Sequence, residues 1–443
     1  MGIMKKTVIG SFLLAFLLHC SVQAMTLKES LGIALQSNPS VITAQKKVAA
    51  ADAKLGQAIG MFMPTIKIDG SYGKLYTQPS TVQITTQTTM GAVTQTMSFG
   101  TNDTQDLKSL QASLSQPVFV AALLPGYKIA QKNYDLAKED LAKTVLDTSF
   151  NVTQAYYGVL KAIKMVKLAD ESRQMAQSHV DQVKAMLAAG VVTKADLLRS
   201  EVQLANAEVG LTRAKNGLEI AKDAFNNALG NNLEQAVDLA EEGLTGTVAV
   251  QPRYKDLMGT AFNSRPDWKQ YLLSKGMSED NLRVAQTAYL PTVMLSAVTG
   301  KQITENPAYS SDVNSWSIVG AASWTLFDGL GIQNRIREAA ANLEAQKATE
   351  EQVRNGIELE VRDAYLNLVS ALETIGSTKK AVASADEGYK VSSLRYNSGV
   401  GTNLEVLDAQ VALTQAKNDY LQSLFDVEIA KAKINKVVGK GVL

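Results

Sequence analysis

The chain carries one arrangement of residues twice, and this internal duplication limits its fold more than any other feature. The segment ALQSNP at 34–39 returns as AFNSRP at 261–266, 227 positions later, and Pro64-Thr65 returns as Pro291-Thr292 at the same distance. Three further matches recur after 209 positions: Ala155-Tyr156 and Ala364-Tyr365, Gly190-Val191 and Gly399-Val400, Gly230 and Gly439. We therefore predict two copies of one structural unit, over 25–245 and 246–443.

The first 24 residues have the pattern of a secretory signal peptide. Lys5 and Lys6 precede an apolar run over 8–18, and small residues lead up to Ala24. The apolar run is short for a bilayer span. A lipoprotein signal has a small residue before its cysteine, whereas His19 precedes Cys20, so lipidation of Cys20 is the less favoured alternative. We expect removal of residues 1–24 and export of the remaining chain.

Composition after this removal excludes several classes of site. The only cysteine would be lost and His179 would be the only histidine, which excludes disulfides and Cys/His zinc sites. The formal charge would change from +1 to −1 with both signs interspersed, so no electrostatic footprint for nucleic acid remains. A carboxylate metal site, paired catalytic carboxylates and a Ser/Thr arrangement with His179 stay open, but no residue pattern points to them. We expect no cofactor and no enzymatic activity.

Two long tracts without proline predict long helices. No proline occurs between Pro125 and Pro252 or after Pro307, and these tracts are rich in Ala, Leu, Lys, Glu and Gln. Heptad seams of mostly small residues run through both: Ala155, Ala162, Ala169, Ala176 and Val183, then Ala364, Ala371, Thr378, Ala385 and Ser392. A sustained seven-residue repeat indicates coiled-coil packing. A helix of about 65 residues is about 100 Å long.

Matched turn signals end both long helices. Gly190 and Gly399 suit a left-handed helix cap, and Thr193 and Thr402 can cap the helix that follows. Each return helix then runs for about 35 residues, to Gly230 or Gly439. Each copy is therefore predicted to contain a long helical hairpin, with tips near 190–196 and 399–405.

Strand-like alternation precedes each long helix. The strand candidates are 65–76, 106–120, 292–300 and 315–327. In the last one, Trp316 and Trp324 share a face and lie about 26 Å apart along an extended strand. This distance is comparable with the apolar band of an outer-membrane barrel, so we predict an aromatic girdle. Hairpins of a soluble β-sandwich are the alternative.

The first copy has its extra residues in a polar segment. Residues 77–104 hold ten threonines and no lysine or arginine, which predicts a long loop that builds no core. Its counterpart, roughly 301–313, is short. Four strands close no barrel and leave open edges in lipid. If the strands span a membrane, several copies of the chain must contribute to one barrel, although this argument leaves the copy number open.

The order of short helix, strand hairpin, long helix, glycine turn and return helix, twice over, resembles the TolC-like outer-membrane efflux proteins across the mature chain. The most specific residues are GVGTNLEVLDA at 399–409 and the matching 190–198. The resemblance implies an α+β membrane protein in which three protomers, with four strands each, form a twelve-stranded β-barrel continuous with an α-helical coiled-coil barrel. It also implies a place in the Gram-negative outer membrane, against its lipid, with the helical tunnel in the periplasm.

The function implied is an exit duct of a tripartite efflux or type I secretion system. The partners implied are two further copies of the chain, a periplasmic adaptor (membrane fusion) protein and an inner-membrane pump of RND or ABC type. The exported substrate stays open. The alternative function is a membrane-anchored structural or adhesive coiled coil, which explains the helices but not the duplicated tips.

The resemblance also assigns roles to residues. Glu405 and Asp408 would be acids that narrow and select at the periplasmic mouth, and Asp196 and Tyr396 would help to close it. The turns would dock the adaptor: Gly190, Val191, Thr193, Gly399, Val400 and Thr402. Gly401 departs from the family prototype, which has an arginine there, so closure is expected to differ. Glu405 could alternatively stabilise only its own helix N-terminus.

Overall fold

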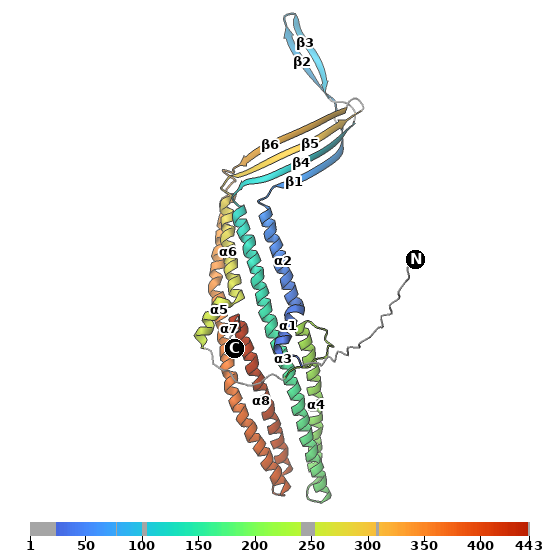
Figure 1. The fold of residues 1–443 in the computed structure, drawn as a ribbon, viewed down its shortest axis with the longest axis vertical. Helices are drawn as coiled ribbons and strands as arrows, with labels where there is room; N and C mark the ends of the chain where they lie inside the picture. Colours follow the sequence, from blue (N-terminus) through green and yellow to red (C-terminus); the bar gives the residue numbers. More distant parts are fainter. Residues whose placement is uncertain (1–23, 77, 100–103, 241–252, 307–309, 442–443) are drawn as a thin grey trace, which may run out of the picture. The chain divides into compact units, whose positions relative to one another are not determined.

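The computed structural model describes residues 24–76, 78–99, 104–240, 253–306 and 310–441 (Figure 1). The predicted signal peptide, Ala24 apart, and its Cys20 lie outside these residues. The remaining elements follow one order twice, which agrees with the duplication seen in the sequence.

The first copy holds four helices and four strands. These are α1 (Leu27–Ser37), α2 (Pro39–Gly60), β1 (Thr65–Tyr76), β2 (Ser80–Thr88), β3 (Gly91–Phe99), β4 (Thr104–Val120), α3 (Leu123–Ala188) and α4 (Lys194–Leu229). The second copy has α5 (Tyr254–Ser264), α6 (Pro266–Thr287), β5 (Thr292–Glu305), β6 (Ser310–Ser323), α7 (Gly331–Asn397) and α8 (Asn403–Val438). The bounds of α1 and α5 differ by 227 positions and those of α4 and α8 by 209, the two offsets of the sequence repeat.

Spatially, the chain divides into two compact units, and each unit draws on both copies. One unit comprises 1–43, 143–265 and 357–443, and the other comprises 44–142 and 266–356. The helical hairpin tips belong to the first unit and all strands to the second.

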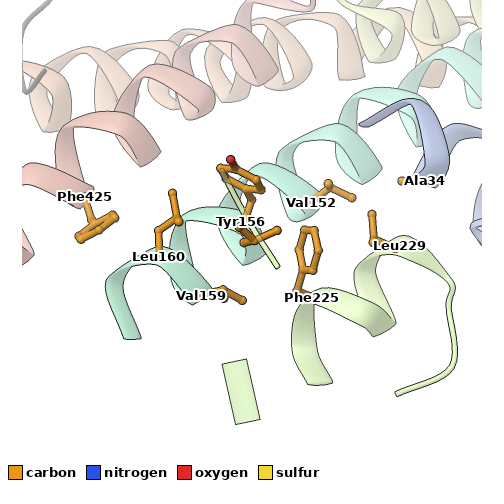
Figure 2. Packing of buried hydrophobic residues seen from close by; sticks show 9 residues of the cluster. Ala34, Val152, Tyr156, Val159, Leu160, Phe225, Leu229 and Phe425 are labelled. Carbon is orange, nitrogen blue, oxygen red and sulfur yellow. The ribbon is translucent and has the colours of Figure 1, made fainter. Parts of the chain in front are cut away.

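The core of the first unit lies where α1, α3, α4 and α8 supply apolar side chains (Figure 2). Tyr156 of α3 is fully buried, and its ring meets that of Phe225 edge-on at 6.1 Å between centroids. The Tyr156 hydroxyl donates a hydrogen bond of 2.7 Å to the carbonyl oxygen of Ala240, so its polar end is satisfied. The surrounding side chains are Ala34, Val152, Val159, Leu160, Leu229, Leu239 and Phe425.

The duplication extends to tertiary contacts in this unit. At the junction of α1 and α2, the Asn38 amide nitrogen donates to the carbonyl of Ala228 at 2.8 Å, near the end of α4. At the junction of α5 and α6, the Arg265 guanidinium donates to the carbonyl of Val437 at 3.0 Å, near the end of α8. The two pairs occupy equivalent positions of the repeat, so each junction satisfies the last carbonyls of its return helix.

The second unit holds an antiparallel four-stranded sheet in the order β1-β4-β5-β6 (Figure 1). Because β1 follows α2 and β4 precedes α3, helices adjoin one end of these strands. Two of the strand predictions need correction at their ends: β5 continues beyond 300 to Glu305, and β6 runs from Ser310 to Ser323 rather than over 315–327.

The segment 77–104 was predicted as a loop, and this is wrong for most of its length. Strands β2 and β3 pair in register through a two-residue turn at 89–90. Threonine and valine favour extended backbone, and cross-strand pairs such as Thr85 and Thr94, with hydroxyl oxygens 3.0 Å apart, stabilise the ladder. The prediction that this segment builds no core is consistent with its residues 80–97, which are all exposed.

Candidate functional site: hairpin tips and sheet faces

The two helical hairpins end in equivalent turns. Gly190 and Gly399 have φ of +74° and +73°, the left-handed conformation that glycine adopts without strain. In both turns the glycine N–H donates to the carbonyl three residues back, and the N–H of Val191 or Val400 donates to the carbonyl five residues back. These bonds form a Schellman motif. The motif leaves Val191 and Val400 64% and 70% exposed at the tips.

Equivalent caps begin the two return helices. The Thr193 hydroxyl accepts a hydrogen bond from the Asp196 N–H, and the Asp196 carboxylate accepts bonds from the Thr193 N–H and hydroxyl at 3.1 and 2.7 Å. These hydrogen bonds from Thr193 lower the pKa of Asp196. In the second copy the Thr402 hydroxyl accepts from the Glu405 N–H at 3.2 Å. Asp196 and Glu405 are therefore the same position of the repeat, and within one chain each lies in the first turn of a return helix.

The candidate mouth acids lie on the first turns of α8. Glu405 and Asp408 are both exposed and one helical turn apart. The Arg395 Nε atom lies 3.7 Å from the Glu405 carboxylate, across the turn between α7 and α8. Both side chains are about half exposed, so this ion pair contributes little to stability, about 0–1 kcal/mol. The second tip therefore carries the positive charge of Arg395 beside Glu405, and Asp408 adds a second negative charge.

The backbone of the second tip approaches itself closely at Gly401. A Cβ atom at Gly401 would lie 2.9 Å from the backbone nitrogen of Tyr396 and 3.0 Å from the Arg395 carbonyl carbon. No side chain fits here unless the turn shifts. The guanidinium at this turn belongs to Arg395, in the last turn of α7. Arg395 was not predicted as a site residue.

A buried polar network joins the two hairpins beneath their tips. The Asn403 amide nitrogen donates to the backbone carbonyl of Asp196 at 3.0 Å, and its Oδ1 lies 2.6 Å from Nε2 of His179. The Ser200 hydroxyl also approaches this oxygen, at 3.3 Å. Burial lowers the pKa of His179, because a charged imidazole is poorly solvated there. Burial therefore favours the neutral histidine, while the hydrogen bond to Asn403 acts in the opposite direction on the pKa. Because Oδ1 of Asn403 accepts, Nε2 of His179 is the donor.

Tyr396, predicted as a closure contact, is buried beside this network. Its ring lies 5.5 Å from that of His179, and its neighbours include Val183 and Val406. Among the described residues its buried hydroxyl has no hydrogen-bond partner. Burial raises the pKa of the Tyr396 hydroxyl, and the negative charge of Asp196 adds to this. The structure thus brings Asp196 and Tyr396 into one region without a direct hydrogen bond.

No role was predicted for His179 from the sequence, and Asn403 was not predicted as a site residue. A signal for His179 was present, because it lies three residues after Ala176 and four before Val183 of the predicted seam, on the same face of the helix. Nothing comparable marks Asn403, which follows the cap Thr402 in a polar run. Its partners come from the other copy of the repeat, about 200 positions away.

Strand alternation and register give the four-stranded sheet one face with an apolar centre and one serine-rich face of mixed polarity. The apolar face consists of Ile66, Ile68, Leu110, Ala112, Leu114, Leu295, Ala297, Trp316 and Ile318. The opposite face carries Lys67, Asp69, Ser71, Ser109, Gln111, Ser113, Ser115, Ser296, Ser315 and Ser317, together with the apolar Leu75, Leu107, Met294, Val298, Val313, Val319 and Ala321. The apolar side chains are largely exposed in the single chain, with Trp316 at 77%.

Trp324, the second residue of the predicted girdle, lies just beyond the end of β6. Its indole N–H donates to the carbonyl of Tyr289 at 3.0 Å, and its side chain is 62% exposed. Toward the other end of the strands, charged pairs follow the apolar rows: Lys108 with Glu305 at 2.8 Å and Lys301 with Asp312 at 2.6 Å. Apolar residues are therefore bounded by an amphipathic aromatic at one end and by ion pairs at the other.

The strands β1 and β6 each have one unpaired side, because they are the edges of this sheet. Both are long, with 12 and 14 residues. Successive strands alternate in direction across the order β1-β4-β5-β6, so β1 and β6 run antiparallel to each other.

A groove runs along α3, α4 and α8 in the first unit, with a volume of about 750 Å³. Small residues line its α4 side at alternating spacings of three and four: Ala207, Gly210, Ala214, Gly217 and Ala221. Gly158, Ala162 and Ala169 line its α3 side. Such spacing lets a further helix approach the backbone closely.

No helix of the described residues is long and apolar enough to cross a bilayer. Within the same residues, no group of three or more His, Cys, Asp or Glu side chains could hold a metal ion. The residues that stand out are those of the tips and of the sheet faces, and none of them forms a catalytic arrangement.

Comparison with known proteins assigns the chain to a family. The outer membrane efflux protein family matches residues 31–231 and 257–440, one match in each copy of the repeat. Outer membrane protein TolC of Salmonella enteritidis is 22% identical over 77% of this chain and 70% of its own length. Alkaline protease secretion protein AprF of Pseudomonas aeruginosa is 23% identical over 97% of this chain and 87% of its own length.

Solved structures show the same fold. The outer membrane protein VceC of Vibrio cholerae superposes with a TM-score of 0.77, covering 94% of this chain and 97% of that one at 17% identity. The predicted fold class, with long helices, antiparallel strands and two repeated halves, is confirmed. Homologues of the TolC family form trimers, act in tripartite systems and carry out no enzymatic reaction. The chain belongs to the outer membrane efflux protein family and is an efflux channel of the Gram-negative outer membrane.

Proposed function

We propose that three copies of this chain form one channel, in which β6 of each copy pairs with β1 of the next. The unpaired sides of β1 and β6 run antiparallel, so the ladder can continue from copy to copy without a change of pattern. Backbone groups in lipid need hydrogen-bond partners, and closure into a barrel supplies them. Three copies of four strands give a twelve-stranded barrel, which agrees with the trimers of the family.

In this barrel the apolar face of the sheet contacts outer-membrane lipid and the serine-rich face lines the lumen. Trp316 and Trp324 then lie at the two lipid–water interfaces, where indole rings are favoured. The pairs of Lys108 with Glu305 and Lys301 with Asp312 lie at the level of the lipid headgroups.

The helical hairpins form a periplasmic tunnel, and the groove on α3, α4 and α8 receives a helix of the neighbouring copy. The small side chains of α4 permit this close approach. Glu405 and Asp408 face the opening at the tips, where three copies bring six carboxylates together. Such a ring attracts cations and repels anions. Asp196 and Tyr396 belong to the contacts that hold this mouth closed.

The tip turns dock the periplasmic adaptor. Gly190, Val191 and Thr193 in one hairpin, and Gly399, Val400 and Thr402 in the other, present two equivalent shapes with an exposed valine each. An adaptor with a repeated apolar contact could therefore engage both tips. An inner-membrane pump of RND or ABC type would deliver substrate through the adaptor.

The observation that carries this proposal is the two-faced sheet with unpaired, antiparallel edges. Native mass spectrometry of the detergent-extracted protein, followed by planar-bilayer recording, tests it. We expect three chains per particle and discrete conductance steps after insertion. A monomer, or an inserted trimer that never conducts even at high voltage, would contradict the proposal.

A further inference from the structure

Strands β2 and β3 form a separate two-stranded sheet within the connection from β1 to β4 (Figure 1). All residues from 80 to 97 are exposed in the single chain. An isolated two-stranded hairpin is marginally stable in water and needs a further surface to pack against. We call this element, Ser80–Phe99, the threonine-rich hairpin.

The hairpin has an apolar face that nothing in the described chain buries. Val82 pairs with Met97 and Thr86 with Val93, and Ile84 lies between these pairs. Strand alternation therefore places Val82, Ile84, Val93 and Met97 on one face, where they are 43–58% exposed. The other face carries polar pairs such as Thr85 and Thr94.

The edges of the hairpin lack the features that keep exposed strands apart. Natural edge strands are protected by charged side chains, proline or bulges. Residues 80–99 contain no charged residue and no proline, and the pairing of β2 with β3 has no register shift. Identical hairpins would therefore approach one another without charge repulsion. The outer edges of β2 and β3 would offer backbone N–H and C=O groups for pairing.

We propose that the hairpins of three copies associate through Val82, Ile84, Val93 and Met97 and form an apolar collar around the exit of the channel. This inference rests on the trimeric channel proposed above, which brings three β1–β4 connections around one axis. The hairpin joins the strand ends that lie opposite the attachment of α2 and α3, so the collar is distinct from the mouth at the helical tips. Its occupant is a second and third copy of the same hairpin.

Cysteine cross-linking in the full-length protein tests the collar. Ile84→Cys places a thiol on the apolar face, and Thr85→Cys, one residue further, places it on the polar face as a matched control. The unsubstituted protein, whose exported chain is expected to lack cysteine, controls for covalent products that do not involve the introduced thiol. Each protein is first shown to be trimeric by native mass spectrometry and is then oxidised with copper phenanthroline in lipid vesicles. One disulfide can join two of the three chains, so the product is a covalent dimer.

We expect Ile84→Cys to give at least about fivefold more covalent dimer than Thr85→Cys, because only the apolar face brings Cβ atoms within disulfide reach. Equal or absent cross-linking in an intact trimer would overturn the collar and leave the trimeric channel standing. A monomer would contradict both proposals.

A second measurement separates copies from lipid as the occupant. An environment-sensitive fluorophore on Ile84→Cys is challenged with vesicles that contain brominated lipid. Fluorescence that brominated lipid does not quench supports packing between hairpins. Strong quenching, with no cross-linking, would assign the apolar face to the membrane and overturn the collar.

Discussion

Nε2 of His179 lies 2.6 Å from Oδ1 of Asn403, and this contact joins the first helical hairpin to the second just beneath their tips. The amide nitrogen of Asn403 donates to the backbone carbonyl of Asp196, which turns Oδ1 toward the imidazole. A buried, neutral histidine therefore lies beneath the helical tips, where the periplasmic mouth of the channel is proposed.

Acidification should destabilise the folded hairpin tips, because a protonated imidazole is poorly solvated at this buried position. Burial holds the pKa of His179 below its usual value near 6.5, so the unfolded or separated state binds a proton more readily. The stabilising contribution is present above pH 6.5 and is lost as the pH falls below that value. Each unit by which the folded state lowers the pKa of His179 corresponds to about 1.4 kcal/mol of folding free energy lost at low pH. We expect the thermal midpoint of the helical circular dichroism signal to fall between pH 7.5 and 5.

His179→Gln is the control for this prediction, because glutamine keeps a donor for Asn403 and does not titrate in this range. Its thermal midpoint should depend less on pH than that of the unsubstituted protein. An identical pH dependence in both proteins would show that His179 is not the group responsible.

Two glycines with nearly equal backbone angles should tolerate alanine very differently. Gly230 has φ of +80°, and an added Cβ would lie 2.8 Å from the Cα of Asn38 and from the Ser37 carbonyl oxygen. Gly190 has φ of +74° and nothing within 4 Å of such an atom. Gly190→Ala should cost about 1–2 kcal/mol for the left-handed conformation, and Gly230→Ala about 1–3 kcal/mol more for the steric overlap.

Urea unfolding of the two variants measures this difference. Equal destabilisation would show that the junction of α1 and α2 moves away from α4 at no cost. The contact between the junction of α1 and α2 and the end of α4 would then contribute little to stability.

Lysine substitutions at two adjacent residues of β6 should separate the faces of the sheet. Ile318 belongs to the apolar face and Ser317 to the serine-rich face. A lysine on the lipid side of a barrel near the bilayer midplane costs about 2–4 kcal/mol, whereas a lumen lysine is hydrated. We expect Ile318→Lys to lower the temperature at which the oligomer dissociates in detergent, with little effect from Ser317→Lys. The reverse order would invert the assignment of the faces.

Much of the fold follows from the sequence because the duplication constrains it. Matched pairs such as Gly190 and Gly399 marked both turns, and the left-handed φ at each confirms them. The threonine-rich hairpin was predicted as a loop because of its polar, low-complexity composition, although threonine and valine also favour extended backbone. The end of β6 was misplaced, since apolar residues continue past Ser323 to Phe327 without continuing the ladder.

The tips were only partly predictable. Caps such as Thr193 act within four residues, so the local sequence identifies them. The network of His179 with Asn403 joins residues 224 positions apart, and no local pattern pairs them. The steric limit at Gly401 likewise depends on the approach of the Tyr396 backbone across the turn, which the local sequence does not reveal.

The central claim is that the helical tips form a cation-selecting mouth, and the reversal potential under a KCl gradient tests it most directly. The proteins compared are the unsubstituted channel, Glu405→Gln with Asp408→Asn, and a control with the exposed acids replaced elsewhere, Glu373→Gln with Asp419→Asn. We predict a cation-preferring reversal potential that moves toward zero in the first variant and stays unchanged in the control. An unchanged potential in the first variant, from a trimer that inserts and conducts, would contradict the claim.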